Sequence, residues 1–260
     1  MTDDKLLVSH AQNLKNRALE NSMITNTLFL DLRQRSLLSA IEKQQSSGVN
    51  TYYYGGYAEA ERVCAVFVPS FFETGENLSE YFSEYEDDNP LALLKVTKDR
   101  FSSLSHRDYL GALMALGIKR EMLGDILVEE TCAYIICIKS ISKFITENLT
   151  SVGRGAVTSK AVPFFEISQR KENFLEIKDC IASARLDNVV SAAFSISRTK
   201  SAEFIEKGVV FVNSGEVTKP DSKVNEGDKI VLRGKGKAVF EKVDAVSKKG
   251  RLHITLKKYI

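Results

Sequence analysis

The sequence has few of the residues that build metal centres and disulfide frameworks. It holds four cysteines and three histidines in 260 residues, and it contains no tryptophan. The cysteines stand at positions 64, 132, 137 and 180, without a Cys-x-x-Cys pair and without a histidine close by. Structural zinc normally draws on closely spaced ligand pairs, so this pattern disfavours a metal site. We expect buried free thiols in a reducing compartment, and no cofactor.

Long apolar segments are lacking too. No run of about 18 apolar residues occurs, which is the length that a membrane-spanning helix requires. The segment Met1–Lys5 is acidic where a signal peptide would be basic, and no apolar core follows it. The hydrophobic and charged shares, 43% and 27%, are ordinary for a folded protein. We therefore expect a cytoplasmic protein with no membrane partner.

The net charge is only +2, so positive and negative charges are nearly balanced over the whole chain. Their distribution along the chain is uneven. Residues 181–260 hold 16 Lys and Arg against 9 Asp and Glu, a net +7, whereas residues 1–180 hold 20 against 25, a net −5. A basic C-terminal segment on an acidic body indicates contact with a polyanion at that end. Charge alone does not separate this interpretation from a merely basic surface.

Residues 1–80 are predicted to form a small α+β domain. Apolar residues recur at helical spacing through residues 3–47 in two stretches, and the second stretch includes Leu28 and Leu30. Arg62–Val68 has the composition of a buried strand. The acidic run Glu73–Asp88, followed by Asn89-Pro90, favours a domain boundary.

Residues 81–175 are predicted to form a middle domain of β-α-β-β-α-β order, an RRM-like or ferredoxin-like arrangement. Ser105 is a suitable cap for the first helix, and Ser140 for the second. The strands are expected at Leu91–Val96, Ile126–Val128, Ala133–Ile138 and Val162–Ile167. Folds of this order serve many functions, so the order alone predicts none.

The remaining segment, 181–260, is predicted to hold two helices followed by hairpins, with residues 171–183 as a bridge before it. Ser197 can cap the second helix, and Gly208 suits the left-handed position after it. Asn213-Ser214-Gly215 is predicted to be a turn, and Val217 to open a strand. A last hairpin is expected to join Ala238–Val243 to Arg251–Leu256.

Cations lie at the predicted helix starts of this C-terminal segment. Arg185 begins the first helix, and Arg198 and Lys200 lie in the first turn of the second. Cations there oppose the helix dipole, and a bound phosphate would offset that cost. The run from Arg233 to Lys237 alternates cations with glycines, so its backbone can follow a phosphate chain closely. The pattern predicts affinity for nucleic acid backbone rather than sequence readout.

Four clusters in this segment closely resemble the S-four RNA-binding domain, named after ribosomal small-subunit protein four. They are Arg185-Leu186-Asp187, Ser197-Arg198, Gly208–Asn213 and Gly227–Ile230. The resemblance implies an αL-shaped helix–helix–hairpin fold that binds structured RNA. The usual Asn-Gly turn of that family is Asn213-Ser214-Gly215 here, which predicts a loop one residue longer. We predict that the RNA contacts are Arg185, Arg198, Thr199, Lys200, Lys207, Asn213, Arg233, Lys235 and Lys237.

Further motifs extend the resemblance to nearly the whole chain. They are Tyr54-Gly55-Gly56-Tyr57 with Ala60-Glu61-Arg62, His106–Leu113, Leu116–Glu121 and Gly124-Asp125-Ile126. These four motifs resemble signatures of the bacterial YlmH family. That resemblance implies an RNA-binding middle domain, structured RNA partners (ribosomal RNA and tRNA), and the large ribosomal subunit, with no DNA expected. It also implies a non-enzymatic role in translation or in ribosome-associated quality control. Arg107, Lys119 and Arg120 form a second candidate RNA face.

Other interpretations remain open at this point. The tyrosines at positions 52, 53, 54 and 57 can either stack on bases or pack in the core, and core packing is the simpler account. An RNA-modifying enzyme with catalysis in residues 1–180 is one alternative, although no glycine-rich cofactor turn or nucleophile–histidine spacing is evident. An interaction protein of cell division, using the acidic body, is another.

Overall fold

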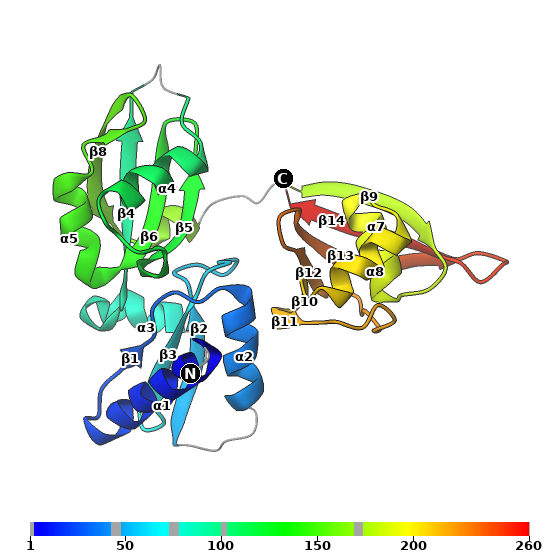
Figure 1. Ribbon diagram of the computed structural model, residues 1–260, viewed down its shortest axis with the longest axis horizontal. Helices are drawn as coiled ribbons and strands as arrows, with labels where there is room; N and C mark the ends of the chain where they lie inside the picture. Colours follow the sequence, from blue (N-terminus) through cyan, green and yellow to red (C-terminus); the bar gives the residue numbers. More distant parts are fainter. Residues whose placement is uncertain (1–2, 43–47, 73–77, 100–102, 169–173, 260) are drawn as a thin grey trace. The chain divides into compact units, whose positions relative to one another are not determined.

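The computed structural model describes residues 3–42, 48–72, 78–99, 103–168 and 174–259 (Figure 1). The chain separates into two compact units, Met1–Arg170 and Lys171–Ile260. None of the helices in the described ranges combines the length and apolarity that a bilayer crossing requires. The mixed α+β class with antiparallel sheets agrees with the prediction.

The first unit begins with two helices and a small antiparallel sheet of order β1-β3-β2. Its elements are α1 (Asp3–Glu20), β1 (Thr25–Asn26), α2 (Leu32–Glu42), β2 (Val49–Tyr54) and β3 (Cys64–Pro69). Helix α1 packs Leu14 and Ala18 against the sheet, where Phe67 is fully buried. The apolar spacing along α1 is therefore the cause of its docking.

The segment between α1 and α2 corrects the prediction of continuous helical structure. Leu28 and Leu30 lie outside both helices. The amide of Leu30 donates to the carbonyl of Val63 over 2.7 Å, and β1 pairs with β3. These tertiary hydrogen bonds and the burial of Leu30 outweigh the local helical pattern.

The rest of the first unit forms a five-stranded antiparallel sheet of order β5-β6-β4-β8-β7. Its elements are α3 (Leu78–Glu84), η1 (Glu86–Asp88), β4 (Leu91–Lys98), α4 (His106–Ala115), η2 (Arg120–Met122), β5 (Leu123–Val128), β6 (Cys132–Ile138), α5 (Lys139–Asn148), β7 (Ser151–Val152), β8 (Gly155–Val162) and α6 (Phe165–Ser168). Without the short β7, the order is that of a ferredoxin-like sheet, as predicted.

The start of α4 is as predicted, whereas the last strand of this sheet is not. Ser105 caps α4 as predicted, because its side chain and that of Asp108 form a reciprocal capping box. The closing strand lies earlier than predicted: β8 ends at Val162, and the segment after Pro163 turns into α6. Strand β8 lies next to the edge of the sheet, where only the two-residue β7 pairs with it on the outer side, and its residues are mostly polar, so an apolar pattern does not mark it.

The two faces of this sheet have different coverings. Helices α4 and α5 cover one face, where Tyr109, Leu113 and Ile145 are buried. The opposite face packs against the N-terminal sheet, so that Leu93 and Ile136 share one core with residues from β2, β3 and α3. Residues 1–80 and the middle segment therefore share a hydrophobic core, and their division into two domains stays a prediction.

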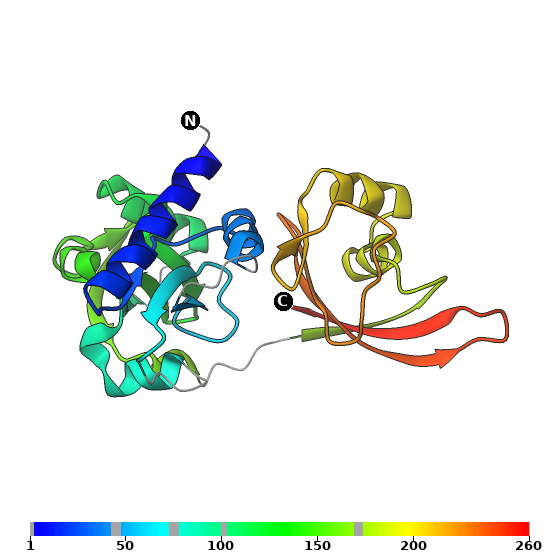
Figure 2. The same cartoon turned by 90° about the horizontal axis from the view of Figure 1, so that it is seen from below.

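The second unit is a six-stranded antiparallel sheet of order β11-β10-β12-β13-β14-β9, with two helices against one face (Figures 1 and 2). Its elements are β9 (Phe174–Ile181), α7 (Leu186–Phe194), α8 (Arg198–Glu206), β10 (Val210–Val212), β11 (Gly215–Glu216), β12 (Lys229–Leu232), β13 (Gly236–Val246) and β14 (Leu252–Tyr259). In both views the β13–β14 hairpin extends past the other strands.

The segment predicted as a bridge is in fact the edge strand β9. It pairs with β14 over its whole length, from Phe174 opposite Tyr259 to Ile181 opposite Leu252. Ile177 and Ile181 pack on the core, while most other residues of β9 are exposed. The prediction that Val217 opens a strand is wrong: β11 ends at Glu216, and the next strand, β12, begins at Lys229.

The turn between β10 and β11 is shorter than predicted. Val212 pairs with Gly215, so the loop contains only Asn213 and Ser214. Both residues have positive φ, 49° and 67°, as a type I′ turn requires. Ser214 therefore occupies the position where the family's glycine is expected, and the loop is not one residue longer. The Asn213 side chain accepts from the amide of Lys229 over 2.9 Å, which ties the turn to β12.

Candidate nucleic-acid interface

Helices α7 and α8 begin next to each other, around the carboxylate of Asp187. Arg185, the N-cap residue of α7, donates from Nε to Asp187 Oδ1 over 3.2 Å. Arg198, the first residue of α8, donates from Nη2 to Asp187 Oδ2 over 2.7 Å. The Asp187 side chain is 7% exposed, against 45% and 56% for the two arginines. We call this arrangement the arginine pair: two exposed guanidinium groups held by one buried carboxylate.

The charge of Asp187 is stabilised by this arrangement. Burial alone would raise its pKa, but hydrogen bonds from Arg198 and Arg185 outweigh burial, and the net pKa lies below the ordinary value. The carboxylate also accepts from the amide of Asn188 over 2.9 Å. A guanidinium carries five N–H donors, and Asp187 uses only one or two from each arginine. The arginine pair therefore has further donors in a fixed orientation for an anion.

Sequence reasoning included Asp187 in a motif but missed its structural role. The signal was present, because an acidic residue two positions after Arg185 lies in the first turn of α7. What the sequence does not show is that α8 starts beside that same carboxylate. The connection between helices, Ser195–Ser197, uses a left-handed residue at Ser195 (φ 51°) to reverse the chain.

The first turn of α8 has the predicted geometry. The Ser197 side chain accepts from the amide of Lys200 over 3.2 Å, so it caps the helix. Arg198, Thr199 and Lys200 are all exposed. The helix start and three exposed polar side chains thus lie at one edge of the unit.

The other predicted contacts are not in the same place. Lys207 lies at the far end of α8, about 14 Å along the helix from Arg198 at 1.5 Å per residue. Arg233 lies near it, since its amide donates to the carbonyl of Val209 over 3.0 Å. Lys235 is exposed in the β12–β13 turn, and Lys237 places Nζ 3.9 Å from the ring centre of Tyr259.

The structure thus divides the predicted contacts into groups. One surrounds the arginine pair, and a second contains Lys207, Arg233 and Lys235, at the far end of α8 and in the β12–β13 turn. Lys237 is separate, because it alternates with Ala238 and Phe240 of the helix-covered core and so lies on the opposite face of the sheet. Asn213 belongs to neither, because its turn follows the end of β10 opposite to Val209. An RNA that touched both groups would have to span the length of α8.

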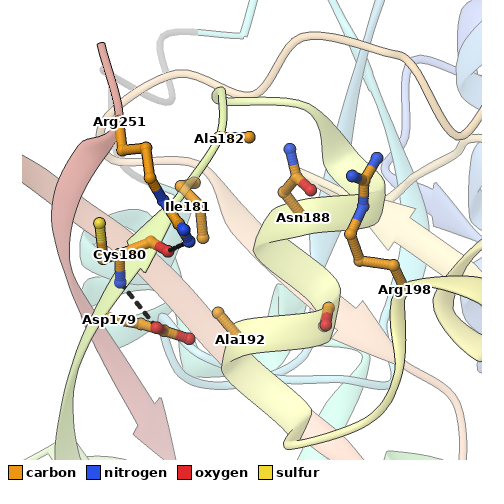
Figure 3. Close-up of a pocket in the computed structure, with 9 residues that line it drawn as sticks. Asp179, Cys180, Ile181, Ala182, Asn188, Ala192, Arg198 and Arg251 are labelled. Atoms are coloured by element: carbon orange, nitrogen blue, oxygen red, sulfur yellow. Dashed lines mark hydrogen bonds between the residues drawn. The ribbon is translucent and has the colours of Figure 1, made fainter. Parts of the chain in front are cut away.

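A pocket of about 400 Å³ lies beside the arginine pair, between β9 and α7 (Figure 3). Arg198 stands on one side of it and Arg251 on the other, with Asn188 between them. Arg251 donates from Nη2 to the carbonyl of Cys180 over 2.6 Å. Sequence reasoning missed Arg251, although it follows Lys248-Lys249-Gly250, a basic hairpin tip.

Three of the four cysteines are buried as predicted, and the fourth is not. Cys64, Cys132 and Cys137 are buried as predicted, and burial raises the pKa of Cys137 to about 12. Cys180 is partly exposed, and it is among the residues that line the pocket. Among the described residues, no group of three or more His, Cys, Asp or Glu side chains could hold a metal ion.

The second candidate RNA face, Arg107, Lys119 and Arg120, is only partly exposed to solvent. Arg107 and Lys119 are exposed. Arg120 is half-buried, and its Nη1 donates to the carbonyls of Leu123 and Gly124 over 2.7 and 3.2 Å. Burial lowers the pKa of Arg120 to about 10, the neighbouring Arg62 adds to that effect, and Asp125 opposes it. Arg120 thus serves the packing of the unit.

Two motifs of the first unit, Tyr54–Tyr57 with Ala60–Arg62 and Gly124–Ile126, meet at Asp125. Its Oδ2 accepts from the Tyr57 hydroxyl over 2.9 Å and from the amide of Glu61 over 2.7 Å, while Oδ1 accepts from the amide of Arg62 over 3.1 Å. The Arg62 side chain donates to the carbonyls of Leu123 and Phe29. These motifs therefore join the N-terminal segment to β5, and we call the arrangement the Asp125 junction.

The tyrosine-rich strand β2 packs into this unit rather than presenting rings to solvent. Tyr54 is buried against Phe82, with ring centres 5.0 Å apart, and burial raises the pKa of its hydroxyl to about 12. Tyr52 and Tyr57 pack on the same core. The core alternative is thus correct for Tyr54. The sheet face on which RRM domains stack bases is covered here by the N-terminal sheet.

Comparisons with known proteins identify two domain families and a relative of nearly full length. Residues 85–166 match the family described as "Putative RNA-binding domain in YlmH", and residues 184–230 match the "S4 domain" family. The chain is 31% identical over 257 residues to the Ribosome-associated protein quality control protein P2 of Bacillus subtilis, covering 98% of this chain and 95% of that protein. The chain belongs to the YlmH family.

Two further relatives of this YlmH family member match it less completely. The small ribosomal subunit protein uS4 of Trichlorobacter lovleyi is 36% identical over 83 residues, which is 30% of this chain and 38% of that protein. The solved structure of the cell division protein ylmH from Streptococcus pneumoniae is 20% identical, with a TM-score of 0.49, covering 65% of this chain and 96% of that chain.

Proposed function

We propose that the protein is a non-enzymatic RNA-binding factor that docks on ribosomal RNA or tRNA at the large ribosomal subunit in the cytoplasm. Its role on this proposal is in ribosome-associated quality control. The observation that carries the proposal is the arginine pair, which lies within the S-four match. The full-length similarity to a ribosome-associated quality control protein supports the biological setting.

The chemistry of the arginine pair suits an RNA phosphate. A planar guanidinium binds phosphate oxygens through two parallel hydrogen bonds, and Asp187 holds each group in place before the RNA arrives. Lys200 and the cap of α8 add a cation and a helix start at the same edge. These groups recognise backbone, so the shape of a folded RNA decides which RNA is bound.

The first unit plays a different part in this proposal. Its central sheet face is covered, so any RNA contact that it makes falls on exposed cations such as Arg107 and Lys119. Arg120 is not part of that surface, because its side chain is bound to the backbone of β5. We propose that the second unit provides most of the RNA affinity.

Reversal of one charge tests the proposal. Arg198→Glu should lower the affinity for ribosomal RNA and reduce the slope of log affinity against log salt by about one. Arg154→Glu is the matched control, because Arg154 is exposed in the turn between β7 and β8 of the first unit. Co-sedimentation with ribosomes over a salt series is the measurement. If Arg198→Glu sediments with ribosomes as the unchanged protein does, the proposed function is wrong.

A further inference from the structure

The pocket between β9 and α7 extends the surface of the arginine pair to residues that the S-four match does not include. That match ends at residue 230, whereas Arg251 follows the tip of the β13–β14 hairpin and β9 precedes the match. Arg198 belongs both to the arginine pair and to the pocket. The volume of about 400 Å³ falls in the range of small-ligand sites.

The charges around the pocket favour an anion. Two guanidinium groups face it from opposite sides, those of Arg198 and Arg251 (Figure 3). One carboxylate, Asp179, also lines it, and that carboxylate accepts from the amide of Cys180 over 2.6 Å. Each arginine has one donor nitrogen engaged with the protein, Arg198 with Asp187 and Arg251 with the Cys180 carbonyl. Both therefore have other N–H donors.

The pocket wall between the two arginines consists mostly of apolar side chains and of polar side chains that already donate hydrogen bonds within the protein. Ile181, Ala182 and Ala192 supply apolar surface. Asn188 donates its amide to the carbonyl and hydroxyl of Ser183, and Ser191 donates to the carbonyl of Ile196. Two flanking cations over an apolar wall suit a nucleotide, whose phosphate needs charge and whose ribose and base need packing surface.

We propose that this pocket holds one nucleotide of the bound RNA, with its phosphate between Arg198 and Arg251. The inference rests on the proposed function, which requires RNA at the arginine pair. The hairpin of β13 and β14, which protrudes in Figures 1 and 2, extends the contact with the RNA, because its turn carries Lys248 and Lys249 shortly before Arg251 in the sequence. The RNA interface is thereby longer than the S-four helices alone.

Ala182 provides the sharpest test, because it is exposed, lines the pocket and carries no polar group. Ala182→Glu adds an anion at the pocket and should weaken binding of a synthetic RNA stem–loop about tenfold at low salt. Ala182→Lys adds a cation and should strengthen binding and increase the salt slope by about one. The readout is affinity over a salt series, measured with the full chain.

Arg251→Gln tests the second guanidinium. The glutamine amide still has N–H donors for the Cys180 carbonyl, but the charge is lost. The salt slope should therefore fall by about one. Thermal unfolding of each variant checks that β9 and β14 remain paired, and the Ala182 variants test the proposal even if Arg251→Gln unfolds.

Matched controls separate a pocket effect from a net-charge effect. Ala156, exposed in β8 of the first unit, takes the same two substitutions. If the changes at 156 alter affinity as much as those at 182, or if the Ala182 and Arg251 variants bind RNA as the unchanged chain does, the pocket proposal is overturned. If only Arg198→Glu weakens binding, the proposed function stands without the pocket. If Arg198→Glu also has no effect, both fail.

Discussion

Arg198 donates a hydrogen bond of 2.7 Å to the buried carboxylate of Asp187, eleven residues earlier in the chain. This contact joins the starts of α7 and α8, and Arg185 binds the same carboxylate. One acidic residue therefore fixes the position of two cations that the sequence presents as separate motifs. It also explains why the cations can lie at helix starts, where the helix dipole alone would disfavour them.

Asp187→Asn should lower the free energy of unfolding of the second unit by about 2 kcal/mol at neutral pH. The substitution removes charge-assisted hydrogen bonds from a buried carboxylate, but its arginine partners are half-exposed and regain solvent, which limits the loss. The chain has no tryptophan, so urea unfolding is followed by circular dichroism. Asp221→Asn, in an exposed loop position, is the control and should change stability little.

The contribution of Asp187 should depend on pH in a defined direction. The folded-state pKa lies below the unfolded value of about 3.9, so the stabilisation is complete above that value and is lost as pH falls through the folded pKa. The stability difference between the unchanged protein and Asp187→Asn should narrow below about pH 4. A constant difference down to pH 2.5, measured by urea unfolding at a series of pH values, would contradict this assignment.

Asp125→Asn should destabilise the first unit by about 2 kcal/mol, because the Asp125 junction offsets the charges of Arg62 and Arg120 and accepts three hydrogen bonds. Arg120→Met removes one of those two cations. The double variant should therefore lose about 1 kcal/mol less than the sum of the single losses. Additive losses in the urea series would show that Asp125 and Arg120 are not coupled. Glu130→Gln, in the exposed β5–β6 turn, is the control.

Gly124→Ala should cost about 1–3 kcal/mol, because an added Cβ would lie 2.7 Å from the ring of Phe29 and 3.2 Å from Ile136. Phe29 is 1% exposed, so its ring cannot move aside. Gly111→Ala is the matched variant, since nothing lies within 4 Å of its Cβ position in α4. It should stabilise the helix by about 0.5–1 kcal/mol. Equal melting temperatures for the two variants would contradict the packing of Phe29 on β5.

Ser214→Gly should stabilise the second unit by about 0.5–1 kcal/mol, because Ser214 has a φ of 67°, which glycine adopts without the Cβ penalty. Ser195→Gly, at φ 51° after α7, should give a similar gain. Neither change removes a charge, so RNA affinity should stay the same. Thermal unfolding and RNA titration are the two measurements, and a loss of stability on Ser214→Gly would exclude the type I′ turn.

Features governed by neighbouring residues could be predicted from the sequence. Ser105 and Ser197 are recognisable as caps because a cap depends on the next three residues. Gly208 is recognisable in the same way, and its φ is 67°. The prediction of Ser140 as a cap is wrong, because α5 begins at Lys139 and Ile138 is its N-cap residue. The middle sheet order followed from alternating strand and helix patterns, except that its last strand is mostly polar and was placed too late.

Features that depend on distant partners could not be predicted. Strand β9 is mostly exposed, and its partner β14 lies more than 70 residues later, so no local pattern marks it. Leu30 fits a helical spacing, yet a hydrogen bond to Val63 decides its conformation. The same holds for the site. Arg198 was predicted from a sequence motif, whereas the position of Arg251 at the pocket depends on the pairing of β14 with β9.

The covered face of the middle sheet has a consequence for how this chain can be divided. A fragment that began near residue 85 would expose Leu93 and Ile136 to water, and a fragment that ended near residue 80 would expose Val66 and Val68. Each would carry an apolar surface of the kind that promotes aggregation. The first 80 residues are therefore an integral part of the fold of the middle sheet, and neither part should stay folded and soluble when the other is deleted.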